Sequence, residues 1–372
     1  DVYKRQALLV YIFKRLILMI PTLLGILAIT FIIIQFVPGG PVEQMVRMLE
    51  GDHSSFGGVN TGVATPGSTT GTEIGQSSGS NVYRGAVGLD EDRLEEIKKL
   101  YGFDKPAHER FVEMIFGFLT FDLGESFFYN KDVWELMKEK LPVSISLGLW
   151  SFFITYVVSL PLGIAKAVRH GSSFDVLTSL AVIIGYAIPG FVLGVILLVF
   201  FGGGSFLQLF PLRGLTSEGW EEMSLLYKVL DYFWHLVLPL TCLVIGSFAT
   251  LTMLTKNTIL EEVNKQYVKT ARSKGLNEKL VLYKHVLRNA LIPIITGFPA
   301  AFVGAFFTGA LLVETLFSLD GLGLLSYESV IKRDYPVVMG TLFFFSLIAL
   351  IAKLINDLLY VFVDPRVKFE GS

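Results

Sequence analysis

Long hydrophobic runs separated by polar segments set the pattern of the chain. Such runs cover residues 16–37, 141–168, 176–201, 235–255, 290–317 and 336–363. Each run is long enough to cross a bilayer as a helix, because the hydrocarbon core needs roughly 20 apolar residues at about 1.5 Å per residue. The pattern therefore predicts an all-α polytopic membrane protein with six transmembrane helices.

Charged residues at the ends of these runs orient the predicted helices. Basic residues stand at 14–15, at 166–169 and at 366–368. Because short cytoplasmic loops are enriched in Lys and Arg, we expect residues 1–15 and the tail 364–372 to lie in the cytoplasm. The hexapeptide that opens the chain lacks an initiator methionine, and we expect it to be foreign to the natural protein.

The first long polar segment, residues 38–140, is predicted to lie outside the membrane. Its middle, from about residue 51 to 88, is rich in Gly, Ser and Thr. Such a stretch buries too little apolar surface to offset its ordering entropy, so we expect a mobile insertion. Amphipathic segments follow at 91–100, 106–119 and 132–140. We expect these segments to form helices on the outer face of the membrane.

A polar segment, residues 256–289, interrupts the transmembrane domain predicted at 141–363. Its basic residues outnumber its acidic ones: Lys256, Lys265, Lys269, Arg272, Lys274, Lys279, Lys284 and Arg288 stand against Glu261, Glu262 and Glu278. A loop this basic is expected on the cytoplasmic side of a bilayer.

The same segment has the pattern of two helices joined by a turn. Apolar residues recur at helical spacing at Ile259, Val263, Tyr267 and Ala271. Gly275 then falls where a helix ends in a left-handed residue, and Asn277 is placed to cap a second helix. That second helix would run through Leu280, Leu282, Val286 and Leu287. We therefore expect a helix, a glycine turn and a helix presented to the cytosol.

The sequence contains no pattern typical of catalysis, metal binding or nucleotide binding. The phosphate-binding pattern G-x-x-x-x-G-K-[ST] does not occur, and the single cysteine, Cys242, cannot form a disulfide framework within the chain. The five histidines are scattered without ligand spacing at positions 53, 108, 170, 235 and 285. We expect no catalytic residue, no metal site and no cofactor in this chain.

Two alternatives from other functional classes remain open. A secondary, ion-coupled transporter of small solutes would show inverted repeats or buried ionisable residues. Lys353 and Asp357 instead lie one helical turn apart and are spaced to neutralise each other, while Glu314 lies near the outer end of a span, within reach of water. An intramembrane enzyme would need a nucleophile and a base on facing helices, and the sequence indicates no such pair.

The segment 256–289 resembles the cytoplasmic coupling loop of ABC-importer permeases. Against the family's general Glu-Ala-Ala motif, only Ala271, Gly275 and Leu287 agree literally. The oligopeptide and dipeptide permease branch favours a form similar to YVKTARSKG and HVLRNALIP, which stand here at 267–275 and 285–293. The resemblance implies that the residues coupling to the ATPase are Tyr267, Lys269, Thr270, Ala271, Gly275, Leu276, His285, Leu287 and Arg288.

Further segments resemble the same family. Residues 314–323, ETLFSLDGLG, look like its outer-loop signature, residues 333–336, RDYP, like the start of its last helix, and residues 364–366, DPR, like its C-terminal motif. Residues 101–106 and 122–126 are similar to the outer segment of the dipeptide-permease first subunit. The resemblance implies an outer gate with the signature residues Glu314, Phe317, Gly321, Gly323, Asp334, Tyr335 and Pro336.

This resemblance implies a fold and a mechanism. The fold is that of a type I ABC-importer permease in a bacterial inner membrane, and residues 39–44 with the Gly-rich insertion are similar to the YejB-like branch that imports microcin C and oligopeptides. Such a permease is not an enzyme. It pairs with a second, homologous permease and with two cytoplasmic ATPase subunits that bind ATP and Mg. A periplasmic solute-binding protein delivers the peptide.

Overall fold

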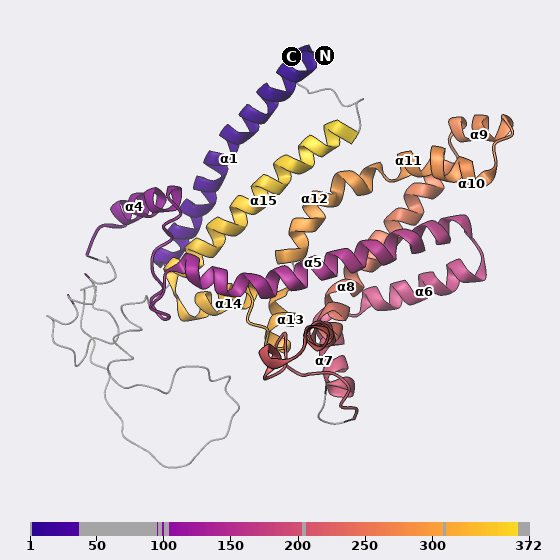
Figure 1. Cartoon of the computed structure of the whole chain (residues 1–372). Coiled ribbons are helices and arrows are strands. Elements are labelled where there is room, and N and C mark those ends of the chain that lie inside the picture. Colours follow the sequence, from indigo (N-terminus) through magenta and orange to yellow (C-terminus); the bar gives the residue numbers. More distant parts are fainter. Residues whose placement is uncertain are drawn as a thin grey trace, which may run out of the picture. The chain divides into compact units, whose positions relative to one another are not determined.

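The computed structural model describes residues 2–36, 95, 99, 104–202, 206–307 and 310–363 (Figure 1). The insertion predicted at 51–88 lies outside the described residues, and so does nearly all of the helix predicted at 91–100. The C-terminal motif at 364–366 lies outside them as well.

The regular structure of the described residues is helical. The α-helices are α1 (Val2–Phe36), α4 (Ala107–Leu119), α5 (Val133–Val168), α6 (Ser173–Ala187), α7 (Gly190–Phe201), α8 (Leu225–Val263), α9 (Gln266–Ser273), α10 (Glu278–Leu280), α11 (Leu287–Ala290), α12 (Ile292–Phe307), α13 (Ala310–Leu316), α14 (Leu322–Lys332) and α15 (Tyr335–Val363). A 3-10 helix, η2 (Trp220–Glu222), precedes α8, and a π-helix, η3 (Val281–Val286), joins α10 to α11.

Four of these helices, α1, α5, α8 and α15, are long and apolar enough to cross a membrane. Two bent pairs raise the number to as many as six if each pair counts as one span. The first pair is α6 with α7, and the second runs from Glu278–Ala290 into Ile292–Ala305. The hydrophobic pattern therefore located the apolar segments correctly, and the structure adds that two of them are broken.

The break between α6 and α7 lies at Pro189, where the two helix axes differ by 94°. Ile188 is extended, with φ −88° and ψ 118°. A proline clashes with an α-helical residue before it and has no N–H to donate, so the helix ends at Ala187 and starts again at Gly190.

Two helices extend well beyond the spans predicted from hydropathy. The separate outer helix predicted at 132–140 is wrong, because α5 runs without interruption from Val133 through Pro142 to Val168. Helix α8 has 39 residues and carries the predicted span 235–255 in its middle. Hydropathy detects only the apolar part of a helix, whereas the backbone hydrogen bonds continue into polar sequence.

The chain divides into two compact units. The larger unit comprises residues 1–25, 134–328 and 341–372, and the smaller one comprises 26–133 and 329–340. In the larger unit, α6, α7 and α13 all pack against α8. The buried residues of this core are Leu147, Leu236, Leu238, Leu240, Cys242, Val313, Phe317 and Leu319.

The predicted ion pair between Lys353 and Asp357 is wrong, because Asp357 pairs with another residue. The Asp357 carboxylate lies 2.9 Å from the guanidinium of Arg15 on α1. Spacing along one helix indicates which residues share a face, but a neighbouring helix supplied the nearer cation.

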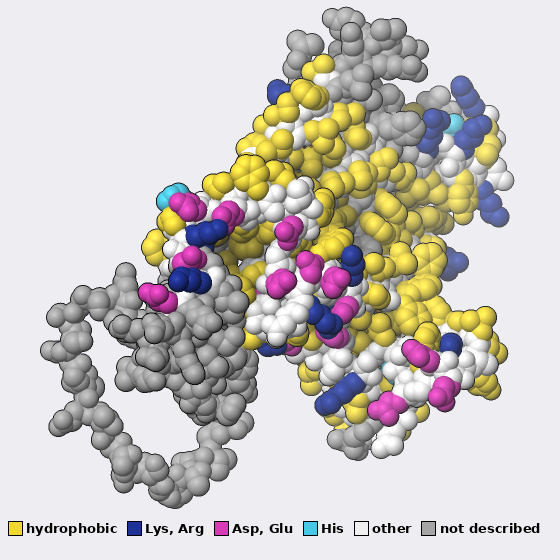
Figure 2. Space-filling view, turned by 60° about the vertical axis from the view of Figure 1, so that its left-hand side comes forward, with side chains coloured by type: hydrophobic (Ala, Val, Ile, Leu, Met, Phe, Trp, Pro, Cys, Tyr) yellow, Lys and Arg dark blue, Asp and Glu magenta, His cyan; other side chains and the backbone are white. Residues whose placement is uncertain are grey.

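Large hydrophobic side chains stay exposed along α1, α6 and α7, among them Phe13, Ile183 and Val195. Figure 2 shows a broad hydrophobic surface, with a group of Lys and Arg side chains at the upper right and others among acidic side chains elsewhere. A soluble domain rarely exposes an apolar surface of this extent. It is the surface expected of helices that face lipid.

Candidate functional site

We call residues 264–291 the knob, because they fold into the short helices that follow α8. Gly275 forms its turn with φ +78°, and the Gly275 N–H donates to the carbonyl of Arg272 at 2.9 Å. The Asn277 side chain accepts from the N–H of Lys279 at 3.0 Å and so caps α10. The left-handed glycine and the asparagine cap are confirmed.

The first helix of the predicted pair is in fact two helices. Helix α8 ends at Val263, Lys265 is extended with φ −73° and ψ 152°, and α9 begins at Gln266. The apolar residues at 259, 263, 267 and 271 therefore belong to two helices that change direction between them. The spacing of the apolar residues stays regular across the bend, so the sequence pattern did not indicate that the helix is interrupted.

The second helix is partly wound as a π-helix. Val281 and Val286 are five residues apart and each is 1% exposed, whereas Leu280, which the pattern grouped with Val286, is 44% exposed. A π-turn aligns residues i and i+5, so the buried face differs from the one that an α-helix would present.

The knob has its own hydrophobic core. Val268 and Ala271 of α9 pack with Val281, Val286 and Leu287. Ile259 of α8 and Ala167 at the end of α5 belong to the same cluster. The knob is thus packed onto two long helices and does not hang as a loose loop.

This core divides the residues that the resemblance assigned to ATPase coupling. Ala271 and Leu287 are buried, at 5% and 7% exposure, and so form the core. The exposed residues are Lys269, Thr270, Gly275 and Arg288, and the half-buried ones are Tyr267, Leu276 and His285. Tyr283, which the resemblance did not single out, is 65% exposed. Tyr283 lies within η3, so a pattern of α-helical spacing did not indicate its exposure.

Polar side chains fix the turn and the bend of the knob. Arg272 donates from Nε and Nη2 to the two carboxylate oxygens of Glu278, at 2.9 and 3.2 Å, across the turn at Gly275. At the bend, the Tyr267 hydroxyl and the Lys265 ammonium both donate to Glu262. Burial, together with the hydrogen bond to Glu262, raises the pKa of Tyr267.

An ion cluster of Lys166, Asp175 and Lys256 joins α5, α6 and α8. The Lys256 ammonium lies 2.8 Å from both Asp175 carboxylate oxygens, and the Lys166 ammonium lies 3.2 Å from one of them. Lys166 also donates to the hydroxyls of Thr178 and Ser179 at 2.8 and 2.7 Å. Lys166 is 0% exposed and Asp175 is 4% exposed.

Sequence reasoning missed this cluster. It treated Lys166 as a flanking charge and Lys256 as part of the basic loop. A signal for Asp175 was present, since Ser172 and Asp175 have the S-x-x-D spacing of a capping box before an apolar run. The Ser172 side chain does accept from the Asp175 N–H at 3.3 Å, and Asp175 accepts from the Gly171 N–H at 3.1 Å.

Glu314 of α13 forms the centre of the outer signature within the larger unit. Its carboxylate accepts from the Leu324 N–H at 2.7 Å and from the Ser144 hydroxyl at 3.4 Å. The residue is 0% exposed, so the prediction that water reaches it is wrong. The loop after α13 folds back over the carboxylate, and hydropathy gave no indication of that fold.

The signature glycines are required by this burial. A Cβ added at Gly321 would lie 2.5 Å from the Glu314 carboxylate, and one added at Gly323 would lie 3.0 Å from it. Phe317, in the same signature, is 2% exposed in the core of this unit. The signature is therefore a packed carboxylate with the close-fitting loop that covers it.

Asp334 forms a second cluster, in the smaller unit. Its carboxylate accepts from the Ser126 hydroxyl and from the Phe127 N–H at 3.2 Å. Burial raises the pKa of the Asp334 carboxyl, although these hydrogen bonds act in the opposite direction. Tyr335 and Pro336 line a cavity of about 540 Å³ in the same unit. The signature residues thus divide into two sites, one in each unit.

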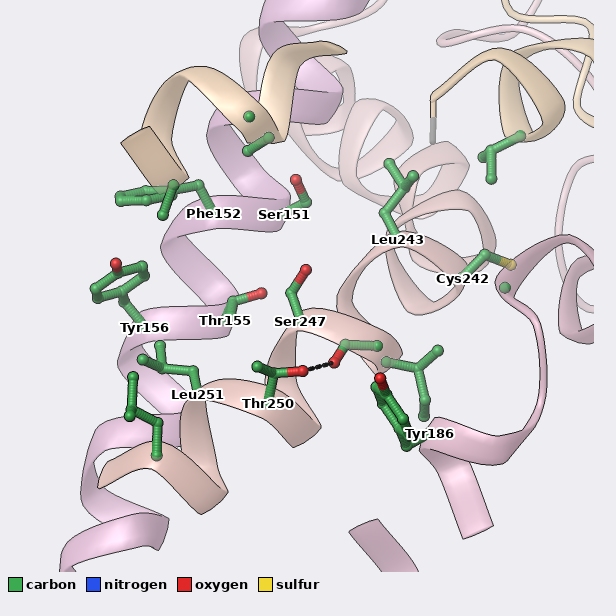
Figure 3. Close-up of a pocket in the computed structure, with 18 of the residues that line it drawn as sticks. Ser151, Phe152, Thr155, Tyr156, Tyr186, Cys242, Leu243, Ser247, Thr250 and Leu251 are labelled. Carbon is green, nitrogen blue, oxygen red and sulfur yellow. Dashed lines mark hydrogen bonds between the residues drawn. The ribbon is translucent and has the colours of Figure 1, made fainter. Parts of the chain in front are cut away.

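A cavity of about 900 Å³ opens among α5, α8, α12 and the α6–α7 break in the larger unit (Figure 3). Its polar side chains are hydroxyls, including Thr155 on α5, Ser247 on α8 and Tyr186 on α6. The residues predicted for coupling and for the outer gate do not line it. The sequence analysis did not identify this cavity.

Comparison with known proteins decides the family. Residues 159–369 match the family model described as binding-protein-dependent transport system inner membrane component. The chain belongs to this family of ABC-importer permeases. The permease is therefore a transporter subunit of the inner membrane and not an enzyme, and the matched residues include the knob, the ion cluster and Glu314 with its glycine loop.

Relatives resemble this permease along nearly its whole length. It is 53% identical to the peptidoglycan transport system permease protein YejB of Agrobacterium fabrum, over 97% of this chain and 98% of that one. It is 52% identical to the inner membrane ABC transporter permease protein YejB of Escherichia coli O157:H7, over 97% and 99%. The oligopeptide transport system permease protein AppB of Bacillus subtilis is 31% identical, over 96% and 99%.

Proposed function

We propose that this permease moves peptides from the periplasm into the cytoplasm. Its similarity to relatives named for peptidoglycan and oligopeptide transport supports peptides as the cargo. Microcin C, the cargo that the sequence resemblance implied, stays a prediction. We further propose that the chain works beside a second, homologous permease and receives its peptide from a periplasmic solute-binding protein.

The structure of the knob supports the proposal that the energy for transport comes from a partner protein. It is an ordered, basic element with a hydrophobic core, packed on α8 and α5, and the sequence contains no phosphate-binding loop. We propose that two cytoplasmic ATPase subunits bind ATP and Mg, and that one of them docks on the knob. The exposed side chains of Lys269, Thr270 and Arg288 would form the contact, with Tyr283 as an apolar anchor.

The buried core residues of the knob have a different role in this proposal. Ala271 and Leu287 hold the knob rigid, so that a movement of the ATPase turns α8 and α5 as solid bodies. On the outer side, we propose that the Glu314 and Asp334 sites hold the loops that form the outer gate. Residues 38–140 would then be periplasmic, and both termini would be cytoplasmic.

A secondary carrier is disfavoured by the way the buried carboxylates are used. The Asp175 carboxylate is held by two lysines, that of Glu314 by a backbone N–H and a serine, and that of Asp334 by Ser126 and a backbone N–H. A proton relay needs carboxylates that can change partners along a path. These three carboxylates are instead fixed in place by their neighbours.

The orientation can be tested by labelling cysteines. Cys242 is replaced by Ala, which leaves no thiol in the chain, and a cysteine is introduced at the exposed Lys274 or Glu218. Glu218 lies between the predicted spans 176–201 and 235–255, so the six-span pattern places it on the side opposite the knob. We expect an impermeant thiol reagent to label Glu218→Cys in intact cells and to label Lys274→Cys only after permeabilisation. The reversed pattern would place the knob outside and exclude its docking to an ATPase.

The source of energy can be tested by reconstitution. The purified chain alone should hydrolyse no ATP, because it has no nucleotide-binding loop. Hydrolysis and peptide uptake should both appear when the ATPase subunits, the second permease and the binding protein are added. Peptide uptake by this chain in liposomes without ATPase, driven by an ion gradient, would favour the secondary-carrier alternative.

A further inference from the structure

The large cavity of the membrane unit has a lining without charge. Its walls come from α5, α8, α12, α13 and the α6–α7 break, and its volume of about 900 Å³ is at the upper end of the usual range for ligand sites. Among the described residues that line it, none is Asp, Glu, Lys, Arg or His. Its polar side chains are almost all hydroxyls, from serine, threonine and tyrosine.

Four of these hydroxyls, those of Thr155, Tyr156, Tyr186 and Ser247, have no hydrogen-bond partner among the residues that the structure describes. Ser151 donates to the Gly148 carbonyl at 3.0 Å and Thr250 to the Gly246 carbonyl at 3.2 Å, so both are satisfied within their own helices. Thr155 and Ser247 make no such bond. Figure 3 shows their hydroxyls turned into the space between α5 and α8.

The chemistry of this lining selects a class of ligand. Thr155 is 5% exposed, and a buried hydroxyl without a hydrogen-bond partner is costly, so an occupant that supplies hydrogen-bonding groups is favoured. An ion would find no counter-charge in this lining, and a lipid tail would leave the hydroxyls unsatisfied. A peptide backbone offers an N–H donor and a C=O acceptor at nearly every residue and carries no charge.

We propose that this cavity holds a neutral, extended stretch of peptide backbone, which Thr155 and Ser247 grip by hydrogen bonds to its amide groups. This inference rests on the proposed function and adds the site and the mode of recognition. Because every residue of a peptide presents the same backbone groups, the cavity passes peptides that differ in their side chains. Selection by side chain then belongs to the binding protein outside.

The glycines of the lining allow a test by filling the cavity. A Cβ built at Gly297 on α12 meets nothing within 4 Å. A larger side chain at this position would extend into open space instead of into packed neighbours. Gly25 on α1 is also free of neighbours within 4 Å but does not line the cavity, so Gly25→Leu is the matched control for Gly297→Leu.

The experiment uses the complete importer, reconstituted in liposomes with its ATPase subunits, second permease and binding protein. Uptake is measured for tripeptides whose central residue is Ala, Glu or Lys, and for an Ala peptide methylated on its central amide nitrogen. Binding of each peptide to the binding protein is measured separately, so that uptake is compared at equal occupancy. ATP hydrolysis stimulated by the loaded binding protein is recorded alongside.

Thr155→Val with Ser247→Ala should lower uptake of all three unmethylated peptides by a common factor of about ten, as expected for two lost hydrogen bonds of ordinary strength. ATP hydrolysis should continue. Methylation of the peptide's central amide should slow uptake by the unsubstituted importer. It should have little further effect on the double variant, because that variant already lacks the hydrogen bonds that methylation removes. Gly297→Leu should reduce uptake, and Gly25→Leu should leave it unchanged.

Unchanged uptake in both the double variant and Gly297→Leu would show that peptides bypass the cavity and would overturn the inference. A reduction confined to the Glu or Lys peptide would also overturn it, because backbone recognition affects all sequences alike. Failure of the unsubstituted importer to take up any peptide would instead overturn the proposed function. The two failures are therefore distinguishable.

Discussion

Asp175→Asn should destabilise the packing of α5, α6 and α8 by about 3–5 kcal/mol, the usual cost of leaving a buried charge without its partner. Lys166 is 0% exposed and Lys256 is 9% exposed, so neither ammonium can turn to bulk water without moving its helix. An asparagine side chain has the size of the aspartate but supplies no negative charge. We expect a clear fall in the melting temperature of the purified permease in detergent.

A matched pair of variants separates burial from charge in this experiment. Glu278→Gln breaks the ion pair between Glu278, whose side chain is 70% exposed, and Arg272. This variant should have little effect on the melting temperature, because exposed ion pairs contribute little to stability. The triple variant Lys166→Met, Asp175→Leu, Lys256→Met removes every charge of the cluster. It should recover most of the lost stability, because apolar replacement of a buried ion cluster is often neutral. If Asp175→Asn melts like the unsubstituted permease, the cluster is not a buried ion cluster in the folded permease.

Gly275→Val should abolish most peptide uptake while the permease is still inserted and assembled. At φ +78° a β-branched residue is strained by about 1–2 kcal/mol, and the strain is relieved by moving the backbone between α9 and α10. Leu276 and the Arg272–Glu278 bridge would shift with it. Since we propose that the ATPase docks on the knob, uptake should fall more than abundance does.

Gly219→Val provides the control for this substitution. Gly219 has φ +76°, and, like Gly275, it has no atoms within 4 Å of a built Cβ, but it lies in the loop before α8 at the other end of that helix. The two variants therefore carry the same kind of strain, one in the loop before α8 and one in the knob that follows α8. Uptake per assembled complex is the measurement. Normal uptake with Gly275→Val, or an equal loss with Gly219→Val, would contradict docking of an ATPase at this turn.

The sequence by itself determined the features that depend on a residue and its near neighbours. The turn at Gly275 and the cap at Asn277 were both marked by local chemistry: a missing Cβ, and a short side chain that accepts from the backbone. The apolar runs determined the membrane class in the same way, because burying a helix in lipid requires an unbroken length of apolar side chains.

Only the tertiary structure decided which distant groups meet. Lys256 and Asp175 are 81 positions apart, and Ser126 and Asp334 are 208 apart, so no spacing rule could pair them. The same holds for the burial of Glu314 beneath its glycine loop. Charge on its own indicates where a residue prefers to lie. Its partner depends on how the helices pack, and packing is settled by shape and burial over the whole unit.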